Sequence, residues 1–155
     1  MRFRFVDRIL DWAPHERIRG TKTVSFEEYN LKEPFGDRPH LPETLALESF
    51  LQLGNWLVLL STDFRQFGLI TRIGTVQFDR SIGPGQQLVM ELNVVRRRSE
   101  GWEIAGTGWV DGRVAMCGVG CLAMAVPVEK FTDPVNLRVV FSEIYQPEPP
   151  DAVKR

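Results

Sequence analysis

The chain has 155 residues, and its 19 Lys and Arg against 20 Asp and Glu give a formal net charge of −1. Its length fits one domain better than two, since domains cluster at about 100–150 residues. The 43% hydrophobic and 25% charged fractions exclude a disordered or collagen-like chain. A pI near 6.1 argues against a dedicated nucleic-acid binder, which normally has a strongly basic face.

The two cysteines and the apolar runs indicate where the protein works. Cys117 and Cys121 would lie about 13 Å apart on one face of a strand, which is too far for a disulfide. We interpret both as buried free thiols, which suit a reducing cytoplasm, and we expect no metal site. The longest apolar run, Trp56–Leu60, is far short of the ~20 residues that span a bilayer, and the N-terminus lacks the apolar segment of a signal peptide. We therefore expect a cytoplasmic protein that does not enter membranes.

The first sixty residues predict two short strands, a loop and one long helix. The strands cover Phe5–Trp12 and Arg17–Phe26 around a polar turn, and two prolines and a glycine make residues 33–39 a loop. The helix runs from Pro42 to about Leu60, with proline in its first turn. Because apolar residues cover most of its circumference, we expect a buried helix.

After the helix the hydrophobic period changes to two. It predicts strands over residues 69–80, 87–97, 102–110 and 113–126, with a two-residue hairpin turn at Asp111-Gly112. The pattern over residues 135–145 indicates an edge strand or a short helix. We predict an α+β fold in which about six antiparallel strands wrap around one central helix. The domain covers residues 1–134, and a partly flexible extension covers 135–155. Such a sheet leaves an edge open, so we expect dimerisation there.

Glu48 is the candidate functional residue that the helix pattern itself singles out. It follows Leu45 by three residues and precedes Gln52 by four, so the three side chains share one helical face. A carboxylate on an otherwise apolar face is costly unless it is paired or functional. An arginine such as Arg38 or Arg72 pairing with it is the structural alternative.

Four motifs resemble the 3-hydroxyacyl-acyl-carrier-protein dehydratases (FabZ/FabA-like proteins). Residues 38–52 read RPHLPETLALESFLQ, against approximately HFPGRPxMPGxLxxExxxQ in that family. Residues 5–10 resemble the family's opening segment, 83–88 its PGDQL turn, and 110–112 its VDG hairpin. The resemblance implies the hot-dog fold, a homodimer or dimer-based hexamer, no cofactor, and an acyl thioester on acyl carrier protein or coenzyme A as ligand.

The resemblance also assigns functional roles to residues. The sequence departs from the family's pattern at the positions that carry the chemistry. Glu48 falls on the catalytic carboxylate, but a gapless alignment places Pro34 where the family has its catalytic histidine, and Glu43 replaces a glycine. His40, the nearest histidine, is either a substitute for that group or an exposed loop residue. The residues expected to contact substrate are Pro34, Phe35, Glu43, Thr44 and Gln52.

Dehydration of a 3-hydroxyacyl thioester needs a base, an acid and a donor to the thioester oxygen. Glu48 supplies half of the acid/base pair, whereas proline at position 34 can transfer no proton, so an unaltered family mechanism is not expected. We interpret the chain as a dehydratase-like protein that binds acyl thioesters in fatty-acid or polyketide-type lipid metabolism. The alternatives are a non-catalytic partner of an active dehydratase or carrier protein, and a hot-dog thioesterase that uses Glu48. The basic run 96–98 either docks an acidic carrier protein or is a solvated hairpin tip.

Overall fold

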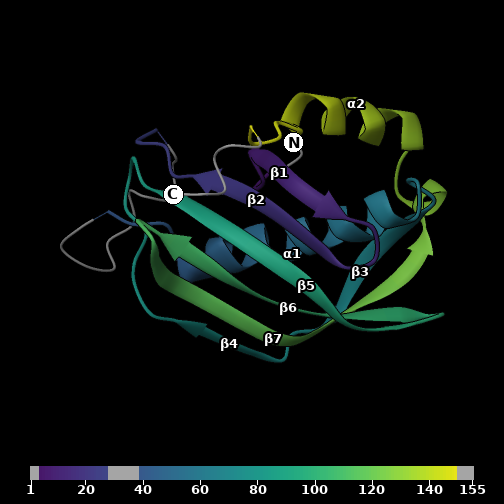
Figure 1. The fold of residues 1–155 in the computed structure, drawn as a ribbon, viewed down its shortest axis with the longest axis horizontal. Helices are drawn as coiled ribbons and strands as arrows, with labels where there is room; N and C mark the ends of the chain where they lie inside the picture. Colours follow the sequence, from purple (N-terminus) through teal and green to yellow (C-terminus); the bar gives the residue numbers. More distant parts are fainter. Residues whose placement is uncertain (1–3, 28–38, 150–155) are drawn as a thin grey trace.

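The computed structural model describes residues 4–27 and 39–149, in which a seven-stranded antiparallel sheet curls around the long helix α1 (Figure 1). The strand order is β1-β2-β5-β6-β7-β3, and β4 also pairs with β7. The strands are β1 (Arg8–Ala13), β2 (Arg17–Thr23), β3 (Gln66–Arg72), β4 (Thr75–Phe78), β5 (Gln87–Arg98), β6 (Gly101–Val110) and β7 (Arg113–Pro127). The helices are α1 (Glu43–Ser61), the short 3₁₀ helix η2 (Val128–Lys130) and α2 (Pro134–Ile144).

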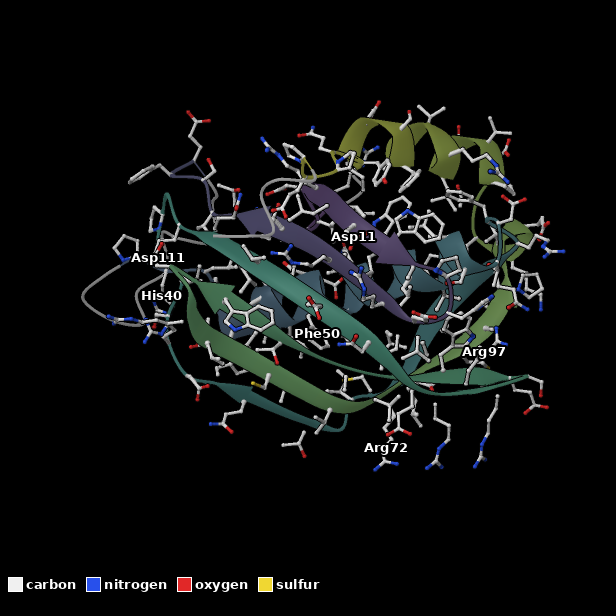
Figure 2. All side chains as sticks on the ribbon, in the orientation of Figure 1. Asp11, His40, Phe50, Arg72, Arg97 and Asp111 are labelled. Atoms are coloured by element: carbon white, nitrogen blue, oxygen red, sulfur yellow. The ribbon has the colours of Figure 1, made fainter. Side chains whose placement is uncertain are left out.

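Helix α1 occupies the concave side of the sheet, as its apolar circumference predicts. Phe50, Leu53 and Leu57 are fully buried. The sheet comes close to the helix where β7 carries Gly118, because a Cβ there would lie only 2.9 Å from Cζ of Phe50. The missing side chain of Gly118 therefore leaves room for the Phe50 ring, which lies at the centre of the molecule (Figure 2).

Strand β5 shows how the period of two builds the core. Leu88, Met90 and Leu92 are fully buried, whereas the intervening residues are half-buried. At the tip of the β6–β7 hairpin, Asp111 and Gly112 have φ values of 51° and 72°. A two-residue turn with two positive φ values matches the twist of the strands it joins.

The strand predicted over residues 69–80 is two strands, β3 and β4, which both pair with β7. The break falls at Ile73-Gly74, where the two backbones approach closely. A Cβ on Gly74 would lie 2.2 Å from the carbonyl oxygen of Val119, and the neighbouring Gly120 has a φ of +69°. The distortion of β7 at Gly120 thus interrupts the ladder opposite it.

The N-terminal strands are shorter than predicted. β1 begins at Arg8, and its register shifts between Ile9 and Asp11. β2 ends at Thr23, whose backbone N–H donates to Oδ2 of Asp7 at 2.5 Å. The chain then turns away from the sheet, which leaves Phe26 78% exposed instead of on an apolar strand face.

The segment 135–145 is a helix. Asp133 is its N-cap, since its Oδ1 accepts a hydrogen bond from the Val135 N–H at 2.8 Å, and Pro134 fills the first turn. In Figure 1, α2 lies beside β1 and runs in the opposite direction to α1. Its Phe141 ring lies 6.2 Å from the ring of Trp56 on α1.

Beyond α2 the chain pairs with the edge of the sheet. Tyr145 forms a parallel bridge with Ile9 of β1, and the Gln146 N–H donates to the Ile9 carbonyl oxygen at 3.0 Å. Glu148 then forms an ion pair with Arg19 of β2 at 3.0 Å. The extension therefore lies against the domain at least as far as Glu148, and residues 150–155 fall outside the described residues.

Candidate functional site

A cavity of about 390 Å³ lies between α1, α2, β3 and the N-terminal segment. One face of α1 supplies its polar wall, with Glu48, Gln52 and Asn55 at spacings of four and three residues. Apolar side chains from the other elements make up most of the remaining lining, among them Val6, Phe67, Leu137, Val140 and Ile144. A few polar groups on an apolar wall are typical of small-molecule sites, whose volumes are about 300–1,000 Å³.

Hydrogen bonds hold the polar wall in place. Gln52 Nε2 donates to Glu48 Oε1 at 2.7 Å, and Gln52 Oε1 accepts from the Phe5 N–H at 2.9 Å. Asn55 Oδ1 accepts from the Gly68 N–H at 2.7 Å. Within residues 4–27 and 39–149, the second carboxylate oxygen of Glu48 has no hydrogen bond. The half-buried Glu48 therefore brings one oriented and unoccupied proton acceptor to the cavity.

Arg72 does not neutralise Glu48. It lies on β3, is exposed, and lines a different hollow together with Arg96 and Arg98. In the part of the chain that the structure describes, Glu48 forms no ion pair, and Arg38 lies outside that part. Among the described residues, the Glu48 carboxylate therefore has an amide partner and no guanidinium partner.

The helix start is separate from the Glu48 cavity. Glu43 and Thr44 are exposed in the first turn of α1, and His40 lies just before it, at the opposite end of the molecule from Arg97 (Figure 2). Among the described residues that line the cavity, none of these three is present. Glu43 and Glu48 lie about 140° apart around the helix axis. The structure thus brings Glu48 and Gln52 together but not His40, and Pro34 and Phe35 lie outside the described residues.

The structure also contains a polar cluster around His15 that sequence reasoning missed. Arg97 Nη1 donates to His15 Nδ1 at 2.7 Å, and the His15 ring lies 5.4 Å from the ring of Trp102. Loss of solvent around the ring, followed by the charge of Arg97, lowers the pKa of His15. His15 therefore favours its neutral form.

Asn55 and the side chains of α2 that line the cavity were also not predicted from the sequence. Asn55 follows Glu48 by seven residues, so helical periodicity could have found it. The α2 side chains come from about ninety positions later in the chain, and no spacing pattern connects them to Glu48.

Three further observations concern metal binding, membranes and the cysteines. Residues 4–27 and 39–149 contain no group of three or more His, Cys, Asp or Glu side chains that could hold a metal ion. Neither α1 nor α2 is long and apolar enough to cross a membrane, and these are the α-helices of the described chain. Both cysteines are free; Cys121 is buried, as expected, whereas Cys117 is half-buried.

Solved structures with the same architecture define the fold class. A Streptococcus mutans protein bound to acetyl coenzyme A has a TM-score of 0.63 at 9% identity, covering 77% of this chain and 88% of its own. A Haemophilus influenzae thioesterase has a TM-score of 0.60 at 10% identity, covering 80% and 81%. A dehydratase heterocomplex from Xenorhabdus doucetiae has a TM-score of 0.59 at 15% identity, covering 88% of both chains. The curled sheet around α1 is the hot-dog fold, as the resemblance implied.

Sequence comparison then gives the family. Residues 1–118 match the FabA-like domain. The 3-hydroxyacyl-[acyl-carrier-protein] dehydratase FabZ of Oleidesulfovibrio alaskensis is 34% identical over 116 residues, which cover 73% of this chain and 75% of that protein. The FabZ of Magnetococcus marinus is 34% identical over 125 residues, covering 79% and 81%. The chain belongs to the FabA-like family of hot-dog proteins.

Proposed function

We propose that the protein binds acyl thioesters, carried by acyl carrier protein or coenzyme A, with the reacting carbons beside Glu48. It works in fatty-acid or polyketide-type lipid metabolism in the cytoplasm. The observation that carries this proposal is the Glu48 carboxylate, which Gln52 orients in an apolar cavity and which keeps one oxygen unoccupied. The names of the FabZ relatives support 3-hydroxyacyl thioesters as the ligand class.

Glu48 has the position and chemistry for one of the two proton transfers in dehydration. One group removes a proton from carbon 2 of the 3-hydroxyacyl thioester, and another protonates the hydroxyl that leaves carbon 3 as water. The Thr44 N–H has no partner within the helix and Thr44 lies one turn before Glu48 on the same face, so this amide, unlike that of Glu43, can donate to the thioester oxygen as it gains charge. Thr44 lies four residues before Glu48, about 6 Å along the axis.

Among the described residues that line the cavity, Glu48 is the one carboxyl group, and no imidazole or thiol lies beside it as a second proton carrier. In the gapless alignment that the resemblance implies, Pro34 would stand at the family's histidine, and His40 is not among the described residues that line the Glu48 cavity. This favours a second candidate function, in which the chain is a non-catalytic subunit that pairs with an active homologue. The dehydratase heterocomplex of Xenorhabdus doucetiae supports such pairing between hot-dog chains.

Incubation of the purified protein with 3-hydroxyacyl, enoyl and saturated acyl thioesters tests the proposal, with every product followed by mass. Interconversion of 3-hydroxyacyl and enoyl thioesters supports dehydration, and release of free acid supports the thioesterase alternative. Saturable binding without turnover supports the non-catalytic subunit. Absence of both binding and turnover for all three thioesters refutes the proposed function.

The role of Glu48 is tested by Glu48→Gln, which keeps the shape and removes the charge. Glu100→Gln, at an exposed turn, is the matched control. We expect Glu48→Gln to reduce turnover by about 10²–10⁴-fold and the control to leave it unchanged. Equal activity of the two variants would remove Glu48 from the mechanism.

The missing histidine has its own test. If its loss limits dehydration, Pro34→His combined with Glu43→Gly should raise turnover, by up to about the same 10²–10⁴-fold. Glu43→Gly alone is the control. Full activity of the unmodified protein that survives His40→Ala would show that the gapless alignment is wrong.

A further inference from the structure

The side-chain amide of Gln52 lies between two neighbours of opposite hydrogen-bonding character. Its Nε2 donates to Oε1 of Glu48 at 2.7 Å, and its Oε1 accepts from the Phe5 N–H at 2.9 Å. A backbone N–H can only donate, and an ionised carboxylate can only accept. Turning the amide over would therefore place two donors together at Phe5 and two acceptors together at Glu48. The Phe5 N–H thus selects the orientation in which Gln52 binds Glu48.

The N-terminal segment 4–7, which carries this N–H, is anchored to β2 through Asp7. The Asp7 N–H donates to the Thr21 carbonyl oxygen at 2.8 Å, and Asp7 Oδ2 accepts from the Thr23 N–H at 2.5 Å. The side chain of Lys22 is only 7% exposed, and its Nζ lies 3.8 Å from the same Oδ2. This Nζ also donates to the Thr23 carbonyl oxygen at 2.6 Å. The Asp7 carboxylate therefore joins the segment to the backbone of β2 and to a buried cation.

The other attachments of the segment are weaker or have no direction. Arg4 forms an ion pair with Glu143 of α2 at 3.3 Å, but both side chains are more than half exposed. Such surface ion pairs contribute little, because solvent screens the charges. Val6 is 4% exposed and lines the cavity, and apolar burial of this kind does not fix the direction of a hydrogen bond. The directional bonds that hold the segment beside Phe5 are therefore those of Asp7.

We propose that Asp7 is a positioning residue for Glu48. It acts through the segment 5–7, whose Phe5 N–H keeps the amide of Gln52 turned toward the carboxylate. This inference rests on the proposed function, because it takes Glu48 as the group that meets the thioester. Asp7 is not among the described residues that line the cavity, so it acts on the carboxylate without contact to the ligand. A carboxylate that is oriented before the ligand binds avoids the cost of ordering during the reaction.

Two substitutions of Asp7 and one control separate positioning from general stability. Asp7→Ala removes the acceptor of the Thr23 N–H and the partner of Lys22. Asp7→Asn keeps an oxygen acceptor of the same shape and loses only the charge. Asp11→Ala is the matched control, because Asp11 lies four residues further along the chain and pairs with Arg17 of β2. Its side chain is 47% exposed, against 38% for Asp7.

The first measurement is the nitrogen–proton NMR spectrum of the Gln52 side-chain NH₂ group, identified as the pair of signals lost in Gln52→Ala. We expect Asp7→Ala to move this pair toward the position of a solvated amide, because Gln52 loses its fixed orientation. Asp7→Asn and Asp11→Ala should leave the pair at its wild-type position. If Asp7→Ala does not fold, deletion of residues 1–5 removes the Phe5 N–H and should move the same pair.

The second measurement is the turnover of a 3-hydroxyacyl thioester. Asp7→Ala should lower kcat by about 10–100-fold and keep KM within about twofold of the wild-type value, because the contacts that bind the ligand remain. Asp7→Asn should recover most of this loss, and Asp11→Ala should show none. Equal losses in Asp7→Ala and Asp11→Ala overturn the inference, because they would report the stability of the N-terminal strands and not the orientation of Glu48.

The two measurements separate this inference from the proposed function. Unmoved Gln52 signals in Asp7→Ala overturn the inference, whether or not the protein has turnover. Moved signals with the wild-type kcat also overturn it, because the orientation of Glu48 then has no effect on the reaction. Moved signals in a protein that lacks turnover support the positioning of Glu48 by Asp7 and refute a catalytic use of that carboxylate.

Discussion

The contact between Phe50 and Gly118 fixes the position of α1 against the sheet, and a double-mutant cycle can measure it. A methyl group at position 118 would lie 2.9 and 3.1 Å from two carbons of the Phe50 ring. That ring is fully buried, so it cannot move into solvent to relieve the overlap. Gly118→Ala should therefore destabilise the protein by overpacking, although alanine is otherwise compatible with a strand.

The structure sets the magnitudes. Overpacking of a well-packed core costs about 1–3 kcal/mol, which is the effect expected for Gly118→Ala. Phe50→Leu leaves a cavity smaller than that of a Phe→Ala change, whose cost is about 3–5 kcal/mol, so we expect about 1–2 kcal/mol. In the double variant the methyl group introduced at position 118 occupies the space that the ring has left. The double variant should therefore lose less stability than the sum of the two single losses, by about 0.5–3 kcal/mol.

Urea unfolding of the four proteins at one fixed protein concentration gives the coupling energy. The concentration is held constant because association would otherwise shift the apparent stability. The midpoints should change while the m-value stays the same, which assigns the effect to the folded state. Additivity to within about 0.3–0.5 kcal/mol would refute the reasoning, since it would mean that the two positions do not compete for the same space.

Three further predictions concern a titrating side chain, a helix cap and the oligomeric state. The pKa of His15 is lowered in the folded state, so the unfolded chain binds this proton more tightly, and stability should fall as pH drops below about 6.5. His15→Asn, which tolerates the positive φ, should flatten the melting temperature between about pH 7.5 and pH 5.5. Asp133→Ala should raise amide exchange within α2 through the loss of about 1 kcal/mol of capping, and Asn136→Ala is the control. Light scattering should give a dimer or dimer-based hexamer of the 17.7 kDa chain, and a monomer at micromolar concentration would refute the expected dimerisation through an open edge of the sheet.

The fold could be predicted where local pattern and tertiary structure agree. Helix α1 and strands β5 and β6 lie within a few residues of the predicted ranges, because one period applies along each of them. The break at Gly74 could not be predicted, since it depends on the distorted backbone of β7 about 45 positions later. The segment 135–145 was ambiguous because its apolar residues fit both periods, although Asp133-Pro134 before it is a helix-start signal.

The site was predictable only as far as one helix carries it. The spacing of Glu48 and Gln52 placed them on one face, and they are hydrogen-bonded there. Arg72 was a reasonable partner by charge, but the position of β3 in the sheet places it away from the cavity. The enclosing residues of α2 depend on the return of the chain across the molecule, which no local pattern contains.

The pairing of Ile9 with Tyr145 affects how copies of this protein can associate. A sheet with two free edges can add a new copy at each edge, so its growth has no natural end. Here the chain following α2 occupies part of the β1 edge, and the β3–β4 edge is the one left open among the described strands. Two copies joined through that edge leave no equivalent edge for a third. We therefore expect the C-terminal segment to favour a closed pair over a growing fibre, and its removal by proteolysis should open the β1 edge to further association.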